Sequence, residues 1–85
     1  MNTIEWKIKA HKQLKKIHPT YQQAIVKAVD GLANFPEENR NVKPLSNHRY
    51  DYRLRVGRYR VLFDHKETIT VITIQEVKKR DEQTY

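Results

Sequence analysis

The segment Tyr52–Phe63, with the sequence YRLRVGRYRVLF, decides the fold. We take Gly57 and Arg58 as the central residues of a two-residue hairpin turn, because glycine at the first of these positions suits a type II′ turn. Counting outward from the turn pairs Val56 with Tyr59 and, at the far end, Tyr52 with Phe63. Side chains alternate between the faces of a strand, so one face of this hairpin is apolar or aromatic throughout: Tyr52, Leu54, Val56, Tyr59, Val61 and Phe63.

The opposite face of the same hairpin carries Arg53, Arg55, Arg60 and Leu62. In the predicted register Arg55 lies directly across from Arg60, and like charges in this position destabilise a sheet. A local rule broken without evident compensation tends to mark a functional site. Guanidinium groups bind phosphate through two hydrogen bonds and stay charged. We interpret this face as a phosphate-binding surface; the alternative is that the arginines are solvated or paired with distant acids.

The rest of the chain alternates short strand and helix patterns around this hairpin. Ile4, Trp6 and Ile8 share one side of a predicted half-buried strand, and the loop at 34–47 is anchored by Val42 and Leu45. The predicted elements are a strand over Thr3–Lys9, a short helix with Ala10, Leu14 and Ile17 inward, a helix from Tyr21 to Leu32, and strands Asp51–Val56, Tyr59–Asp64 and Thr68–Gln75. This β-α-α-β-β-β order predicts an α+β fold, with two N-terminal helices packed on one face of a small, mainly antiparallel four-stranded sheet.

Length and charge restrict the class of protein. A chain of 85 residues suits a single domain, 1–85, and it contains no cysteine and no apolar run long enough for a membrane span. We therefore expect a cytoplasmic protein with no membrane partner. The net charge of +7 favours a polyanionic partner, either nucleic acid or an acidic protein. Histidine spacing forms no metal motif, so neither a metal nor a cofactor is expected.

Two longer stretches carry a family resemblance. Nearly the whole chain resembles the RelE/ParE superfamily of bacterial toxins. The resemblance is carried by the stretches "LSNHRYDYRLRVGRYRVLFD" and "TITVITI", by a basic tail ending in tyrosine and by the opening "EWKIKAHKQLKKI". The resemblance implies a type II toxin with a cognate antitoxin protein, binding operator DNA only as the toxin–antitoxin complex. RelE-like members are ribosome-dependent endoribonucleases that cut A-site mRNA without a metal. ParE-like members share the fold, inhibit DNA gyrase and lack the RNase residues.

The resemblance also implies the site residues. Basic residues on the second strand, an arginine on the third and an arginine and a tyrosine near the C-terminus correspond to Arg53, Arg55, Arg60, Arg80 and Tyr85. The second-strand positions are lysines in the best-known member, and the variable spacing in the tail leaves Lys79 as a substitute for Arg80. A YoeB-like branch has a general-base glutamate where this chain has Lys43, which argues against that branch.

RNA cleavage requires a general base, and arginine cannot act as one because it keeps its proton in proteins. The arginines can stabilise the charge on the phosphate, and Tyr85 is the candidate base or orienting group. The expected RNA contacts are Lys43, Lys78, Lys79 and Arg58, and the three lysines are also alternative bases. Retention of Arg80 and Tyr85 favours the RNase over the gyrase inhibitor; a nucleic-acid-binding module without catalysis is a third possibility.

Overall fold

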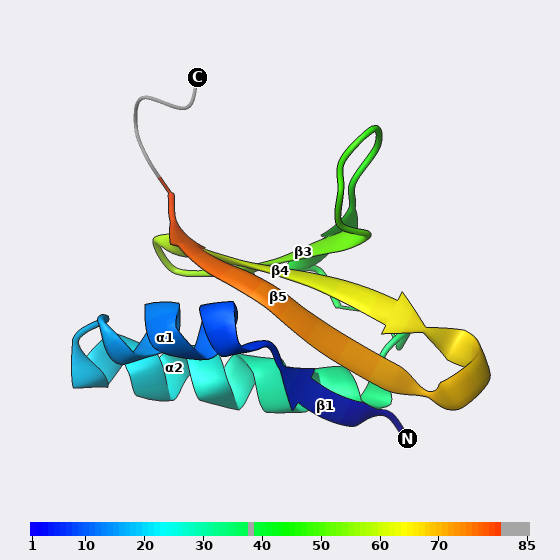
Figure 1. The fold of residues 1–85 in the computed structure, drawn as a ribbon, viewed down its shortest axis with the longest axis horizontal. Coiled ribbons are helices and arrows are strands. Elements are labelled where there is room, and N and C mark those ends of the chain that lie inside the picture. The colour runs from blue at the N-terminus through cyan, green and yellow to red at the C-terminus, as the bar shows by residue number, and fades with distance from the viewer. Residues whose placement is uncertain (38, 81–85) are drawn as a thin grey trace.

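A computed structural model describes residues 1–37 and 39–80, so Tyr85 lies outside the described residues. Figure 1 shows both long helices lying beneath one face of a sheet, which confirms the α+β class and the placement of the helices. The elements are β1 (Thr3–Trp6), α1 (Ile8–Lys15), α2 (Pro19–Asp30), η1 (Gly31–Asn34), β2 (Val42–Pro44), β3 (Tyr52–Val56), β4 (Tyr59–Lys66), η2 (Glu67–Ile69) and β5 (Val71–Lys79).

The described residues form a sheet of five strands in the order β1-β5-β4-β3-β2, so the prediction of four strands was wrong. The additional strand, β2, lies inside the predicted loop and pairs antiparallel with β3. It is only three residues long, which is too short to show an alternating pattern. It ends in Pro44, and proline is tolerated at a sheet edge. The sheet is also mixed, because β1 runs parallel to β5 while the other pairs are antiparallel.

The hairpin of β3 and β4 has the predicted register in full. Val56 pairs with Tyr59, Arg55 with Arg60, and the pairing continues to Tyr52 with Phe63. Gly57 has a φ of 56°, which a type II′ turn requires at its first central position and which glycine adopts without a Cβ clash. The register follows from local sequence because the turn length and the apolar alternation agree.

Two predicted boundaries were wrong. The first strand ends at Trp6 and α1 begins at Ile8, whose side chain is 75% exposed instead of facing the core. The last strand begins at Val71 and continues to Lys79, because β4 extends to Lys66 and residues 67–69 form the turn. The residues Val77 to Lys79, expected in the tail, therefore belong to the sheet.

A β-bulge in β5 decides which of these residues face the helices. Leu62 lies opposite Glu76, but the next residue of β4, Phe63, lies opposite Ile74, so Gln75 is the additional residue. A bulge shifts the side-chain alternation of one strand against its partner. Val77 consequently joins the core, while Glu76 and Lys78 lie on the other face of the sheet with Leu62 and Arg60.

The core lies between the helices and the sheet. Trp6 packs against its edge, as predicted. The strand β5 continues past the residues that pair with β1, and there α1 lies along its edge in place of a strand. The backbone N–H of Val77 donates to Oε1 of Gln13 at 2.7 Å. The largest fully buried side chains come from α2, η1 and three strands: Ile25, Val29, Leu32, Leu54, Val61, Phe63, Ile72 and Ile74.

Candidate nucleic-acid interface

The side of the sheet that faces away from the helices, called the outer face below, carries a row of three cations. Arg55 on β3 lies opposite Arg60 on β4, and Arg60 lies opposite Lys78 on β5. Residues directly opposite each other on antiparallel strands have Cβ atoms about 4.5–5.5 Å apart. The structure thus extends the predicted like-charge pair by a third cation, which the bulge brings to this face.

A second row lies next to the first, one step further from the hairpin turn. Lys43 on β2 is opposite Arg53 on β3, which in turn is opposite Leu62. The strand β2 thereby places Lys43, expected in a loop, beside the arginines. Leu62 is only 4% exposed although it lies on the outer face. Nε of Arg53 is buried and has no hydrogen-bond partner among the described residues, a costly state for a donor unless a bound ligand satisfies it.

The remaining predicted site residues separate into two groups. The backbone N–H of Arg80 donates to the carbonyl of Arg58, so both residues lie at the hairpin-turn end of the cation row. Lys79 lies opposite Tyr59, which is on the face of β4 that packs against the core. The side chain of Lys79 therefore leaves the sheet on the helix side. The structure therefore does not bring Lys79 to the outer face, because strand alternation separates it from Lys78.

Glu76 is an outer-face residue that sequence reasoning missed. Its carboxylate is buried, accepts a hydrogen bond from the Tyr50 hydroxyl at 2.9 Å, and lies 3.5 Å from Nζ of Lys9 and 3.6 Å from Nζ of Lys78. Burial raises the pKa of Glu76, but the Tyr50 hydrogen bond and the charges of Lys78 and Lys9 outweigh it, and the net pKa is lowered. The carboxylate thus stays ionised and holds Lys78 beside Arg60.

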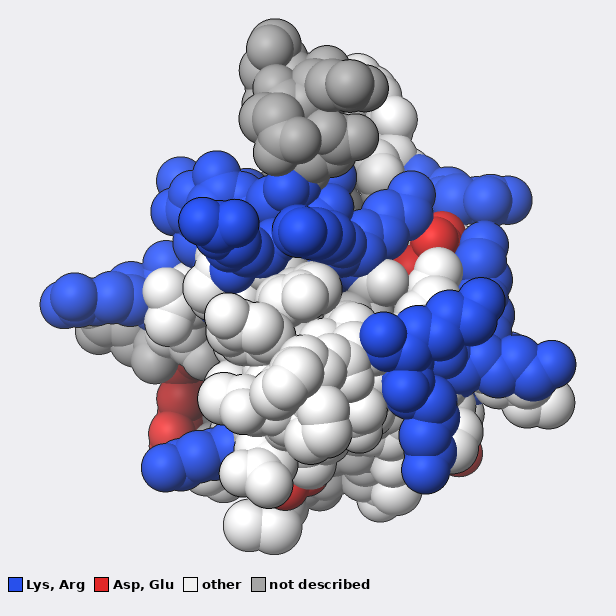
Figure 2. Space-filling view, turned by 90° about the vertical axis from the view of Figure 1, so that its left-hand side faces the viewer, with Lys and Arg blue, Asp and Glu red and all other residues white. Residues whose placement is uncertain are grey.

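The outer face changes charge along its strands. Beyond Leu62, Asp64 accepts hydrogen bonds from the backbone N–H of Asp51 and from Nε2 of Gln75, at 2.8 and 2.9 Å. Figure 2 shows a broad band of Lys and Arg side chains on the outer side of the sheet, with uncharged surface below it. The phosphate backbone of a nucleic acid would therefore be attracted to the hairpin-turn end and repelled near Asp64.

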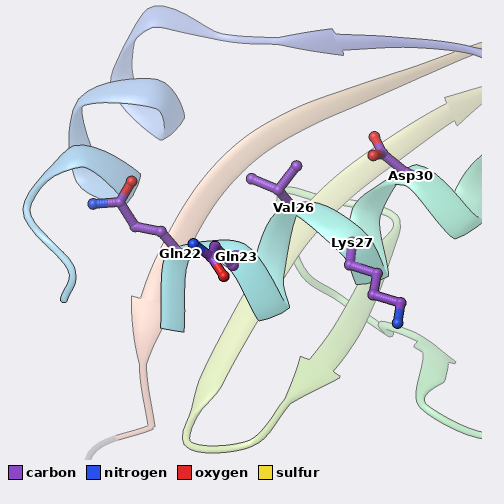
Figure 3. Close-up of a pocket in the computed structure, with 5 residues that line it drawn as sticks. All are labelled: Gln22, Gln23, Val26, Lys27 and Asp30. Carbon is purple, nitrogen blue, oxygen red and sulfur yellow. The ribbon is translucent and has the colours of Figure 1, made fainter. Parts of the chain in front are cut away.

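A shallow pocket of about 380 Å³ lies elsewhere, on α2. Figure 3 shows that its lining side chains all come from this one helix: Gln22, Gln23, Val26, Lys27 and Asp30. It carries one cation against one carboxylate and no convergent set of polar groups, so the outer face is the better candidate site. Within the described part of the chain, no group of His, Cys, Asp or Glu is placed to hold a metal ion, and no helix is long and apolar enough to cross a membrane.

The sequence and the fold both match known toxins. A model of the ParE toxin of type II toxin–antitoxin systems, parDE, matches residues 4–84. Because this match covers nearly the whole chain, the protein belongs to the ParE toxin family, within the RelE/ParE superfamily of type II toxins. The predicted resemblance is confirmed at this level. No curated protein matches the chain.

Several similar solved structures contain RelE toxins. The RelBE2 toxin–antitoxin complex of Mycobacterium tuberculosis contains a chain with 27% identity and a TM-score of 0.79, covering 93% of this chain and 98% of that one. A RelE–RelB complex from Pyrococcus horikoshii gives 25% identity, a TM-score of 0.79 and coverage of 95% and 97%. The isolated RelE toxin of E. coli shares the fold, with 17% identity, a TM-score of 0.80 and coverage of 96% and 87%.

Proposed function

We propose that this toxin is a metal-independent endoribonuclease that cuts mRNA in the A site of the ribosome. The observation that carries the proposal is the row of Arg55, Arg60 and Lys78 across three adjacent strands, with Arg53 and Lys43 beside it. The row costs sheet stability, because like charges directly opposite each other are destabilising. The row provides fixed positive charge for binding a phosphate, and a bound phosphate would also supply an acceptor for the buried Nε of Arg53.

The proposed reaction is attack of the 2′-oxygen on the adjacent phosphorus, with cleavage of the bond to the 5′-oxygen. The 2′-OH loses its proton to a base, the phosphate gains negative charge, and the leaving 5′-oxygen takes up a proton. Arg60, in the middle of the row, stabilises the charge that develops on the phosphate. Tyr85 is the proposed base or orienting group, with Lys43 and Lys78 as alternatives on the outer face. The ribosome contributes positioning for in-line attack, which can supply several kcal/mol.

A second candidate function is inhibition of DNA gyrase without RNA cleavage. The observation that favours it is the family match itself, because the matching model describes the ParE toxin. In that case the outer face would serve as a protein-binding surface and its arginines would have no catalytic role. Arg80 in the sequence and the cation row in the structure support the RNase over this alternative.

The proposed partner is a small antitoxin protein with an acidic, amphipathic segment. The Mycobacterium tuberculosis and Pyrococcus horikoshii structures are both toxin–antitoxin complexes. This chain has a charge of +7, which speeds association with an acidic partner. Ile8, Tyr21 and Val26 are exposed on the helices and provide apolar contacts. Operator DNA is proposed as a ligand of the toxin–antitoxin complex only.

The test is single-turnover cleavage of mRNA on ribosomes saturated with toxin. Arg60→Ala should slow cleavage by about 10²–10³, as is typical for loss of one preorganised charge donor, and Tyr85→Phe by about 10²–10⁴. Binding to the ribosome should stay near the wild-type level. Lys78→Ala and Lys79→Ala form a matched pair, because neighbouring residues leave the sheet on opposite faces: the first should impair cleavage and the second should not.

Two outcomes would contradict the proposal in different ways. If Arg60→Ala and Tyr85→Phe both cleave at the wild-type rate, the RNase site is misassigned. If the wild-type protein cuts no mRNA but inhibits supercoiling by gyrase, the ParE-like function holds instead.

A further inference from the structure

The segment between β2 and β3 rises above the outer face, as the green loop in Figure 1 shows. Its base is closed by a hydrogen bond from the backbone N–H of Leu45 to the carbonyl of Asp51, at 2.9 Å. Near its end the loop carries three consecutive side chains with planar groups, His48, Arg49 and Tyr50. The loop thus presents flat groups at the border of the proposed phosphate-binding surface.

These three planar groups lie close together. The guanidinium carbon of Arg49 is 5.6 Å from the centre of the Tyr50 ring, and the centre of the His48 ring is 5.7 Å from it. The backbone N–H of Tyr50 donates to Nδ1 of His48 at 3.1 Å, which fixes the backbone between them. His48 and Arg49 are exposed, and Arg49 forms no ion pair within the described part of the chain. Their flat surfaces are therefore accessible to a ligand.

The cluster is tied to the cation row by Glu76. Tyr50 donates its hydroxyl hydrogen to Glu76, which also contacts Lys78, the neighbour of Arg60. The hydrogen bond to Glu76 raises the pKa of Tyr50, with a smaller contribution from burial. Tyr50 therefore keeps its proton and is unsuited to act as a base.

We propose that His48, Arg49 and Tyr50 form a stacking platform for one nucleobase of the RNA strand whose phosphates lie on the outer face. This inference rests on the proposed RNase function and adds a contact to a base, where the arginine row contacts only the backbone. Proteins that bind single-stranded RNA combine a positively charged surface with aromatic or guanidinium planes on which bases stack. The platform selects for a base that is unstacked from its neighbours and adds binding free energy to that of the phosphate contacts.

The experiment measures single-turnover cleavage of ribosome-bound mRNA as a function of toxin concentration. Tyr50→Leu should raise the concentration for half-maximal rate by about 5- to 150-fold, the usual effect of losing one stacked base. The maximal rate should stay near the wild-type value. Tyr50→Phe keeps the ring but loses the hydrogen bond to Glu76, so it should lose less than Tyr50→Leu, and His48→Ala should show an intermediate loss. His11→Ala is the matched control for His48→Ala, because His11 is exposed on α1, in the helix layer.

An mRNA with an abasic nucleotide at one position of the A-site codon separates stacking from loop damage. At the stacked position the abasic substitution should weaken wild-type binding, and Tyr50→Leu should then cause no further loss. If Tyr50→Leu behaves as wild type, or if its effect persists on every abasic mRNA, the platform is refuted while the RNase function stands. If the wild-type protein neither binds nor cleaves ribosomal mRNA, the RNase function fails first and the platform falls with it.

Discussion

At the scale of single residues, Glu76 organises the outer face. It is a buried carboxylate surrounded by Tyr50, Lys9 and Lys78, and the interactions come from a loop, a helix and the same strand. A buried charge is costly unless it is paired and hydrogen-bonded, and here both conditions are met. Loss of its charge would remove the ion pairs with Lys9 and Lys78 and weaken the hydrogen bond that holds the loop carrying Tyr50.

The lowered pKa of Glu76 predicts how the stability of the protein depends on pH. The folded-state pKa lies below the ordinary value of 4.5, so the carboxylate stabilises the fold fully above about pH 4.5. This contribution is lost as the pH falls through the folded-state pKa. The variant Glu76→Gln cannot titrate, so its free energy of unfolding in urea should fall less between pH 6 and pH 3 than that of the wild type.

The control for this measurement is Glu67→Gln, because Glu67 is an exposed carboxylate in the turn before β5. It should keep the pH dependence of the wild type. An equal loss of stability in acid for Glu76→Gln and the wild type would show that the Glu76 network does not stabilise the fold.

At the scale of elements, the hairpin contributes its apolar face to the core. Leu54 is 2% exposed and lies between Val42 and Val61 on the neighbouring strands. Leu54→Ala should lower the free energy of unfolding by about 2–5 kcal/mol, because it removes buried methyl groups and leaves a cavity. Ile69→Ala, at a side chain that is 65% exposed, should change it by less than about 0.5 kcal/mol. A denaturant melt checks both, and an equally small loss for Leu54→Ala would refute its core position.

The contact of α1 with the edge of β5 allows a second test at this scale. Gln13→Leu removes the acceptor for the backbone N–H of Val77, and an unpaired buried donor costs about 1–3 kcal/mol. Gln13→Glu keeps an acceptor oxygen and should be milder. Hydrogen exchange at the Val77 amide should become faster in Gln13→Leu and stay slow in Gln13→Glu. Equal exchange in all three proteins would show that α1 does not protect this edge.

At the scale of the whole molecule, positive charge is divided between two surfaces. The outer face holds the fixed cation row, while the exposed lysines Lys12, Lys15 and Lys16 lie on and just after α1. We expect these helix lysines to attract ribosomal RNA without contributing to the chemistry. The cations of the row, in contrast, are spaced closely enough to contact one phosphate together.

Salt dependence separates these two contributions. Replacing Lys12, Lys15 and Lys16 by alanine together should weaken ribosome binding and reduce the slope of log affinity against log salt concentration by about 2, at about 0.7 per lost phosphate contact. Saturated single-turnover cleavage should remain at the wild-type rate. An unchanged slope, or a slower rate at saturation, would show that the helix lysines do not act as a general attraction.

The sequence alone determined the hairpin, its register and its two-sided character. These features follow from a two-residue turn and from alternation over twelve consecutive residues, so neighbouring positions in the chain contain all the information. The two amphipathic helices were predictable for the same reason, and so was the like-charge pair of Arg55 and Arg60. Tyr85 remains a prediction, since it lies outside the described residues.

Only the tertiary structure decided the composition of the outer face beyond the hairpin. Lys43 joins it because a three-residue strand pairs with β3, and Lys78 and Glu76 join it because Gln75 bulges out of the pairing of β4 with β5. Alternation along β5 without the bulge would have turned Glu76 and Lys78 toward the helices and Val77 away from them. A bulge depends on how two distant strands fit against one core, and no pattern within a single strand reveals it.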